Sequence, residues 1–270
     1  MMTSDKPIVI ETRGLRKVFS ADRAPITALQ NISFAVREGS FVSLVGPSGC
    51  GKSTLLQMLA GLMPSTAGEV LVDGLAVRKP APDKISVMFQ DATLLPWKRI
   101  AENVEFPLEV RGTNAAERRE RAAAMLSLVG LTDFGARYPH ELSGGMRQRV
   151  AIARALAPNP RILLMDEPFG ALDEQTRIKM GHELLDIWSK TKKTIFLITH
   201  SLTEALFLSD VVLVMSHRPG QIVGVIEAGL PRPRTYDIIG SAEFGAARNR
   251  IWKLISQDDD ESNDNGMASL

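Results

Sequence analysis

The sequence has 270 residues, of which 44% are hydrophobic and 23% are charged, and its formal net charge is +1. This length allows one large α/β domain with a smaller subdomain. The near-neutral charge argues against strong attraction to nucleic acid or an anionic membrane surface. A single cysteine, Cys50, excludes an intramolecular disulfide framework and is typical of a reducing compartment. No stretch resembles a signal peptide or approaches the roughly 20 apolar residues of a membrane span, so we expect any membrane role to need a partner.

In chain order, short β-rich runs alternate with longer helical patterns, which predicts a mostly parallel sheet surrounded by helices. The first runs lie close together with turn residues between them, so an antiparallel β portion is expected before the parallel core. The expected strands are 8–12, 32–36, 41–45, 69–72, 86–89, 162–165, 194–198 and 211–215. The expected helices are 52–60, 115–129, 144–157, 174–190 and 202–208.

Two further parts of the chain differ from this alternation. The region between Gln90 and Ile162 reads mainly as helix, which predicts a helical subdomain of about 91–160 inserted into a domain of 1–230. The remaining residues, 231–270, begin with prolines and end in an acidic polar run. They predict a C-terminal extension with a short helix near 242–255 and a disordered acidic tail.

The strongest chemical pattern is GPSGCGKS at residues 46–53, which directly follows an apolar strand and precedes a helix. Its glycines allow the backbone to wrap so that successive N–H groups face phosphate oxygens. Lys52 is expected to reach the β- and γ-phosphates, and Ser53 to bind Mg²⁺. The alternative, a glycine-rich turn that binds nothing, is disfavoured by the flanking strand and helix. The predicted ATP-binding residues here are Gly46, Pro47, Ser48, Gly49, Cys50, Gly51, Lys52, Ser53 and Thr54.

An apolar strand, ILLM, ends in the two acids Asp166 and Glu167. Neighbouring strand residues point to opposite sides, so these acids are expected to have different tasks. Asp166 is a candidate for the Mg²⁺ shell, and Glu167 is a candidate base for the attacking water. Alternatively, both acids are solvated at the start of a loop. His200 ends another strand, TIFLITH, and either senses the γ-phosphate or is structural; the residues alone leave both open.

The run LSGGMRQR at 142–149 resembles the signature motif of the ATP-binding cassette (ABC) family, with Ser143 as the expected N-cap of a helix. The other family motifs follow in order. Gln90 matches the Q-loop glutamine, Asp173 closes a D-loop, and His200 matches the switch histidine. Phe19 occupies the place of the aromatic residue that stacks on adenine. The resemblance covers about residues 8–227 and implies an ATPase of the P-loop NTPase fold that uses ATP and Mg²⁺.

The resemblance also implies a mechanism in which two cassettes pair head to tail with ATP between them. Glu167, His200 and Gln90 would be catalytic, and Ser53, Gln90 and Asp166 would surround Mg²⁺. Asp173 would lie at the dimer contact. The residues implied to bind the nucleotide held by the second copy are Ser143, Gly144, Gly145 and Gln148.

Residues 94–97, LLPW, form an apolar cluster that either packs internally or, as in the family, receives a cytoplasmic helix of a membrane permease. The stretches LLPWKRIAENVEFPLEVRG and SHRPGQI resemble the nitrate, sulfonate and taurine branch of importers. This implies a permease, a second copy of the chain and indirectly a solute-binding protein, with no nucleic acid. It also implies a cytoplasmic location on the inner face of the membrane. The alternative is a non-transport cassette that acts on a macromolecular partner; the short insertion disfavours it.

Two residues depart from simple expectations. Ser201 stands where many family members carry an acid, which predicts a weaker local dimer contact. Cys50 is expected either to be a small tolerated residue or to form a thiolate among the N–H groups of the phosphate loop. The transported solute, the role of residues 231–270, any regulation, and whether the cassettes pair as a homodimer or a heterodimer are not determined by the sequence.

Overall fold

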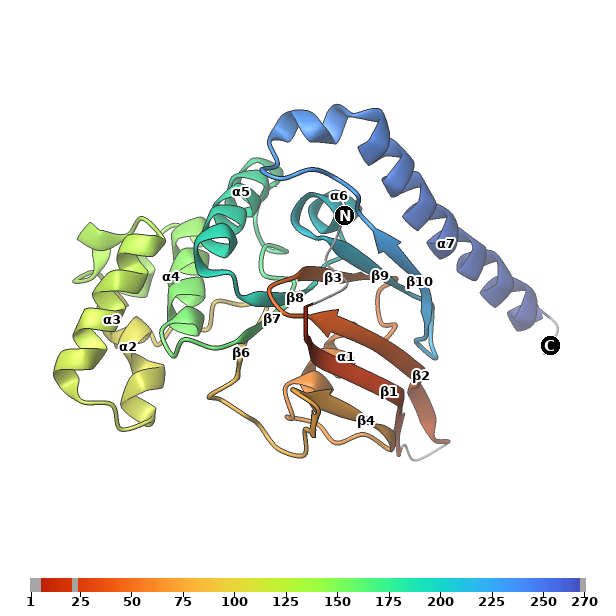
Figure 1. Cartoon of the computed structure of the whole chain (residues 1–270), viewed down its shortest axis with the longest axis horizontal. Coiled ribbons are helices and arrows are strands. Elements are labelled where there is room, and N and C mark those ends of the chain that lie inside the picture. The colour runs from red at the N-terminus through yellow and green to blue at the C-terminus, as the bar shows by residue number, and fades with distance from the viewer. Residues whose placement is uncertain (1–5, 21–23, 268–270) are drawn as a thin grey trace. The chain divides into compact units, whose positions relative to one another are not determined.

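The computed structural model describes residues 6–20 and 24–267 of the chain (Figure 1). The chain divides into two compact units. Unit 1 consists of Met1–Ala81 and Thr194–Leu270, and unit 2 is Pro82–Lys193. Unit 2 therefore contains more than the expected helical insertion, because two strands and an additional long helix also belong to it.

Unit 1 begins with an antiparallel four-stranded sheet, as expected. Its strands are β1 (Ile8–Phe19), β2 (Ile26–Arg37), β4 (Ala67–Val72) and β5 (Leu75–Ala76), in the order β2-β1-β4-β5. β1 and β2 have 12 residues each and are longer than the sequence predicts, because shifts of register let irregular stretches stay paired. Their inward side chains, such as Val9 and Leu29, are fully buried.

The parallel strands of unit 1 are almost wholly buried. β3 (Phe41–Val45) pairs in parallel with both β8 (Thr194–Ile198) and β9 (Val211–Met215), and β10 (Ile222–Glu227) adds an antiparallel edge to β9. Every residue of β3 and β8 is buried, which explains why both appear in the sequence as continuous apolar runs. Helix α1 (Lys52–Leu59) follows β3 directly, so the connection between them lies at the carboxyl edge of the strands.

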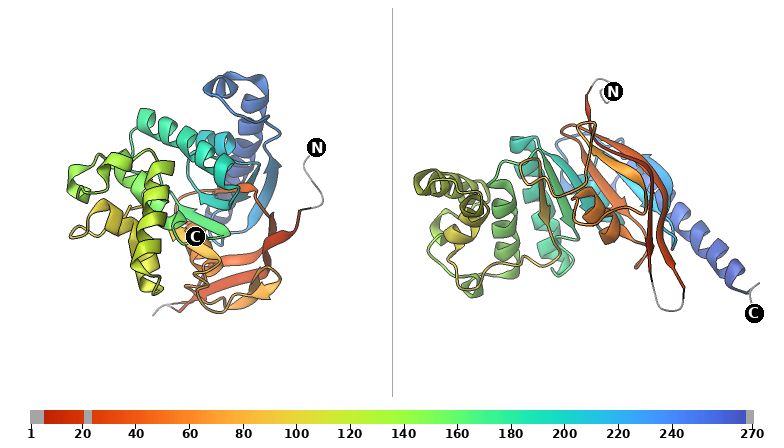
Figure 2. Two further views of the ribbon diagram at one scale, coloured as in Figure 1. Left: turned by 60° about the vertical axis from the view of Figure 1, so that its left-hand side comes forward. Right: turned by 90° about the horizontal axis from the view of Figure 1, so that it is seen from below.

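The C-terminal part of unit 1 is more helical than the sequence predicts. After α6 (Leu202–Leu208), a short 3₁₀ helix at Tyr236–Gly240 leads into α7 (Ala242–Met267), which contacts α6, β9 and β10. Figure 2 shows α7 as one long helix. The helix is longer than the expected 242–255 and continues through the acidic run to Met267. Its apolar stripe, Phe244, Ala247 and Ile251, is buried and explains how it stays attached.

Unit 2 combines a parallel strand pair with a group of helices. The strands β6 (Ile85–Met88) and β7 (Ile162–Asp166) pair in parallel with Met88 opposite Met165. The helices are α2 (Ile100–Val110), α3 (Ala115–Leu128), α4 (Gly144–Leu156) and α5 (Glu174–Thr191), with short 3₁₀ turns at Thr132–Phe134 and Pro139–Glu141. Helices α2, α3 and α4 pack against one another (Figures 1 and 2). In the described part of the chain, no helix combines the length and apolar run needed to cross a membrane.

Candidate ATP-hydrolysis site

The loop of residues 46–53, the phosphate loop, connects the end of β3 to the start of α1 in unit 1. Gly49 has φ +75° and Gly51 has φ +108°, so both occupy backbone conformations that favour glycine. A Cβ atom at Gly51 would lie 2.7 Å from the Leu29 Cδ2 atom, which leaves no space for another residue. The loop is therefore tightly wound and ends at the N-terminus of α1, where free N–H groups favour an anion.

Lys52 and Cys50 are the buried side chains of this loop. The Lys52 Nζ atom donates hydrogen bonds to the carbonyl oxygens of Gly46 and Pro47, both at 2.8 Å. The Lys52 ammonium group is thus held against the backbone of the phosphate loop. Burial raises the pKa of the Cys50 thiol, although the nearby Lys52 ammonium opposes this. Of the two alternatives for Cys50, this favours a small tolerated residue over a thiolate, because desolvation outweighs the neighbouring positive charge.

His200 lies two residues beyond β8, and the phosphate loop begins directly after β3. Because β3 and β8 are parallel neighbours, both segments leave the same carboxyl edge of unit 1. Ser201 has a local role that does not require an acid. Its Oγ accepts a hydrogen bond from the Glu204 N–H at 3.2 Å and caps α6. The Glu204 carboxylate in turn bonds the Thr199 hydroxyl, which anchors the start of this helix beside His200.

Phe19, the predicted adenine-stacking residue, ends β1 and is partly exposed. The Lys17 Nζ atom lies 5.1 Å from the centre of its ring and donates to the Pro64 carbonyl at 2.9 Å. The Lys17 ammonium group therefore lies over one face of the Phe19 ring.

The carboxyl edge of unit 2 brings together Gln90, Asp166 and Glu167. β6 and β7 end side by side, so Gln90, two residues after β6, leaves the same edge as Asp166, the last residue of β7. A Cβ atom at Gly170 would lie 3.4 Å from the Glu167 Oε2 atom and 3.5 Å from the Gln90 Nε2 atom. The two side chains therefore converge on Gly170, as the sequence could not show.

Glu167 has a backbone conformation that is unusual for its residue type. Its φ is +43°, in the left-handed region, where a residue with a Cβ atom is strained by about 1–2 kcal/mol. The Gly170 N–H donates to the Glu167 carbonyl at 3.0 Å and closes the turn that imposes this conformation. Strain of this kind concentrates at functional sites.

The starts of helices α4 and α5 lie next to each other in unit 2. Ser143 caps α4 by accepting from the Met146 N–H at 3.3 Å, and Asp173 caps α5 by accepting from the Thr176 N–H at 3.0 Å. That hydrogen bond lowers the pKa of the Asp173 carboxyl. Space beside Gly144 and Gly145 is narrow, since a Cβ atom at Gly145 would lie 3.2 Å from the Thr176 Cγ2 atom. Two positive helix ends therefore share one surface of unit 2.

Gln148 points away from that surface. It is 5% exposed, and its Nε2 atom donates to the Gln90 carbonyl at 3.2 Å. Gln148 therefore holds the backbone at Gln90. Its expected contact with a nucleotide on a second copy stays a prediction.

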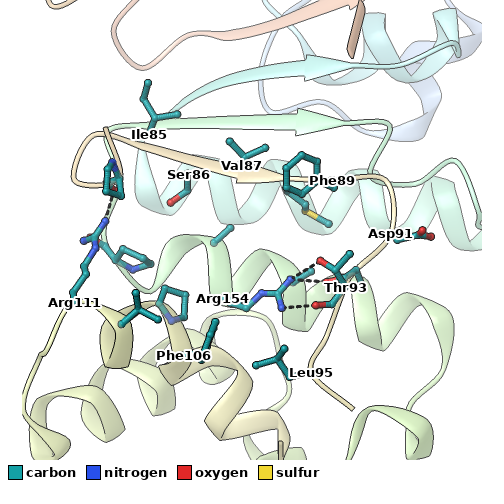
Figure 3. Close-up of a pocket in the computed structure, with 18 residues that line it drawn as sticks. Ile85, Ser86, Val87, Phe89, Asp91, Thr93, Leu95, Phe106, Arg111 and Arg154 are labelled. Carbon is teal, nitrogen blue, oxygen red and sulfur yellow. Dashed lines mark hydrogen bonds between the residues drawn. The ribbon is translucent and has the colours of Figure 1, made fainter. Parts of the chain in front are cut away.

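A cavity of about 470 Å³, which sequence reasoning did not reveal, lies between β6, α2 and α4 (Figure 3). The Arg154 guanidinium closes one end by donating to the carbonyls of Ala92 and Thr93 at 2.6 and 2.8 Å. Arg111 bonds the Pro82 carbonyl at the other end. Burial lowers the pKa of Arg154. The apolar part of the lining includes Val87, Phe89, Leu95, Phe106 and Val110.

The rim of this cavity exposes apolar side chains. Val110 is 71% exposed, and nearby along the chain Trp97 is 72% exposed. Asn103 holds the segment before α2, since its fully buried side chain bonds the Leu95 N–H at 2.7 Å and the Lys98 carbonyl at 3.0 Å. Trp97 is thus presented on a fixed loop, and its side chain is not packed inside unit 2.

In each unit, the side chains predicted to bind the metal carry oxygen ligands. Ser53 offers a hydroxyl, Gln90 an amide oxygen and Asp166 a carboxylate, and all are oxygen ligands of the kind that Mg²⁺ prefers. No three His, Cys, Asp or Glu side chains gather into a metal cluster within the described residues.

Comparison with known proteins agrees with the resemblance. Residues 29–170 match the family model described as ABC transporter. The taurine import ATP-binding protein TauB of Rhizobium johnstonii is 49% identical over 240 residues, 87% of this chain and 91% of that protein. The nitrate import ATP-binding protein NrtD of Synechocystis sp. is 45% identical over 252 residues, 91% and 94% of the two chains.

A solved dimeric ATP-binding cassette, in a post-hydrolysis state bound to ADP and Pi, is 34% identical with a TM-score of 0.72. It covers 82% of this chain and 100% of that one. A further dimeric bacterial ABC transporter cassette is 35% identical with the same TM-score and the same coverage. These matches confirm the predicted α/β fold. The chain belongs to the ABC transporter family and is one of its ATP-hydrolysing cassettes.

Proposed function

We propose that this chain is the ATPase subunit of an importer that takes up a small solute of the taurine or nitrate type through a separate permease. The similarity to TauB and NrtD over most of both chains supports this class of transporter. The observation that carries the proposal is the tightly wound phosphate loop on buried β3, with Lys52 fixed on its carbonyls.

In this proposal the phosphate loop binds ATP, and the N–H groups at the start of α1 face the phosphates. Lys52 moves from the loop carbonyls to the β- and γ-phosphates, and Phe19 stacks on the adenine. Ser53, Asp166 and Gln90 would each offer an oxygen ligand to Mg²⁺, which when bound would neutralise charge on the phosphate oxygens.

Glu167 accepts a proton from the water that attacks the γ-phosphate, while His200 contacts that phosphate from the neighbouring strand. General base catalysis of this kind contributes roughly 10²–10⁴-fold in rate. The turn at Gly170 supports this role because it holds the Glu167 carboxylate close to the Gln90 amide. Gln148 fixes the Gln90 backbone from below.

A second copy completes the site. The capped start of α4, with Ser143, Gly144 and Gly145, faces the ATP that is bound to the partner copy, and Asp173 lies at the seam. Free N–H groups and the positive end of the helix suit a γ-phosphate. The dimeric state of both similar solved cassettes supports this arrangement. Loss of the γ-phosphate removes the contact, so hydrolysis opens the pair.

The cavity beside α2 receives a cytoplasmic helix of the permease, which places the chain on the inner face of the membrane. An apolar groove with an exposed rim is typical of a site that binds an amphipathic helix. The fixed loop that presents Trp97 supports a contact that transmits force. A solute-binding protein outside the membrane would then select the solute.

The importer role is tested by expressing the tagged chain in its own cells and isolating it from detergent-solubilised membranes. We expect a permease to co-purify, and reconstituted vesicles to take up taurine or nitrate only with ATP inside the compartment that holds the cassette. A chain that instead sediments with ribosomes or DNA would favour the non-transport alternative. The co-purification result does not depend on knowing the solute in advance, because the partner itself is identified.

A further inference from the structure

A closed loop at residues 216–221 follows β9 and packs against the phosphate loop within unit 1. Ser216 closes this loop, since its N–H donates to the Gln221 carbonyl at 2.9 Å and its Oγ accepts from the Gln221 N–H at 2.9 Å. The Ser216 side chain is buried. The 216–221 loop is therefore a fixed turn, and the side chains that it carries start from defined positions.

The backbone of this loop touches β2 on one side and the phosphate loop on the other. The Gly220 N–H donates to the Ala28 carbonyl at 2.9 Å, and the Gln30 N–H donates to the Gly220 carbonyl at 3.0 Å. A Cβ atom at Gly220 would lie 2.3 Å from the Cys50 carbonyl oxygen. Only glycine allows this approach, so the two loops are in backbone contact.

The end of β9 supports the beginning of the phosphate loop in the same way. A Cβ atom at Gly46 would lie 2.7 Å from the Met215 carbonyl oxygen. The phosphate loop is thus backed at its start by Met215 and near its end by Gly220. Its middle, around Gly49, has no such backbone support among the contacts described, and a side chain reaches it instead.

That side chain is Arg218, whose Nη2 atom donates to the Gly49 carbonyl at 2.8 Å. The peptide bond between Gly49 and Cys50 is trans, so the Gly49 carbonyl and the Cys50 N–H point in opposite directions. Because the Gly49 carbonyl faces Arg218, the Cys50 N–H points to the opposite side, away from the 216–221 loop. The guanidinium charge also strengthens the hydrogen bond, since charge-assisted bonds are about twice as strong as neutral ones.

We propose that Arg218 is a positioning residue for the ATPase reaction: its bond to the Gly49 carbonyl directs the Cys50 N–H toward the triphosphate. Arg218 acts through the backbone of the loop and is not itself a catalytic residue. The inference rests on the proposed function, because it takes residues 46–53 as the site of ATP. It assigns a task to the SHRPGQI stretch, which the ATPase mechanism otherwise leaves unused.

The test compares Arg218→Ala and Arg218→Lys with the unchanged protein. Calorimetric titration with a non-hydrolysable ATP analogue and Mg²⁺ gives Kd, and steady-state hydrolysis gives KM and kcat. We expect Arg218→Ala to weaken binding about tenfold, the effect of losing one charge-assisted hydrogen bond. KM should rise similarly while kcat stays within about twofold, because this N–H contact is made in both the ground state and the transition state. Arg218→Lys should recover most of the affinity, since an ammonium can still bond the carbonyl.

Two controls separate the possible failures. Arg13→Ala removes another exposed arginine of unit 1, one that pairs with Glu11, and should bind like the unchanged protein. Lys52→Ala should lose binding; if it binds normally, the proposed ATP site itself is wrong. If Lys52→Ala loses binding but Arg218→Ala keeps the normal Kd, only the present inference is overturned. A lower unfolding midpoint of Arg218→Ala without nucleotide would assign the residue to folding and overturn the inference as well.

Discussion

The strained backbone at Glu167 leads to a prediction that reverses a common stability rule. Replacing glycine by alanine usually stabilises a protein by about 0.4–1 kcal/mol, because the unfolded chain loses freedom. At Glu167, φ is +43°, and a Cβ atom in that region costs about 1–2 kcal/mol. We therefore expect Glu167→Gly to be more stable than Glu167→Ala by about 1 kcal/mol. This is the backbone strain that glycine relieves, minus the stability that glycine loses because it makes the unfolded chain more flexible. Both variants lack the carboxylate, so its contacts cancel in the comparison.

The assay is thermal unfolding of the two variants under identical conditions without nucleotide. A difference of 1 kcal/mol corresponds to a midpoint about 2–4 °C higher for Glu167→Gly in a protein of this size. The matched control is Glu120, an exposed residue inside α3 of the same unit. There, Glu120→Ala should be the more stable of the corresponding pair by about 1 kcal/mol, because glycine weakens a helix interior. If Glu167→Ala equals or exceeds Glu167→Gly in stability, the strain at Glu167 is refuted.

Three further predictions concern other parts of the chain. Arg234 is buried and donates to three carbonyls at the end of α6, those of Leu206, Phe207 and Ser209. Arg234→Met should lower the free energy of unfolding by on the order of 3 kcal/mol, because carbonyls lose their donors; a loss below about 1 kcal/mol in denaturant titration contradicts this. Cys50, 1% exposed with a raised thiol pKa, should react with maleimide more than about tenfold slower than in denaturant; equal rates contradict its burial. Trp97→Ala should leave ATP hydrolysis by the isolated chain unchanged but reduce permease-coupled transport. The control Trp252→Ala, which removes a 62% exposed tryptophan from α7, should leave transport unchanged. Normal transport by Trp97→Ala would contradict the proposed docking role.

Most of the parallel core could be predicted from the sequence because its strands are buried on both faces. β3, β8 and β9 match their expected limits, since continuous apolar runs bounded by turn residues leave little ambiguity. β10 was missed because it is an edge strand in which Val223 and Val225 face solvent while Gly224 interrupts the run. Its antiparallel pairing with the preceding strand β9 was therefore not predicted.

Helix α2 was missed for a different reason. Pro107 lies inside it, and a proline within an otherwise helical pattern normally indicates a break. A signal was available, because Glu102 stands three residues after Arg99 and its carboxylate accepts from the Arg99 N–H at 2.6 Å. This is one half of a capping box, because arginine at the N-cap has no acceptor for the other hydrogen bond, so the pattern is easily overlooked. The cavity beside α2 could not be predicted without the helix.

The chemistry of the site was predictable where residue types are specific and unpredictable where geometry decides. Asp166 was recognised from its position after a strand and Gln90 from the family resemblance, and the parallel pairing of β6 and β7 brings them to one edge. The inward turn of Gln148 was not visible, because a glutamine on a helix can face either way. The sequence left two alternatives for Cys50 open, since burial of its thiol is a property of the folded loop. The support from Arg218 comes from a segment 169 residues away along the chain.

The central claim is that ATP closes two copies of this chain and that its hydrolysis opens them. Glu167→Gln keeps the size of the side chain but removes the base, so ATP should bind without being cleaved. Light scattering after size exclusion should then show a dimer of Glu167→Gln in saturating ATP and Mg²⁺, and a monomer with ADP. The double variant with Lys52→Ala should stay monomeric in both. A Glu167→Gln protein that remains monomeric in saturating ATP would contradict the account.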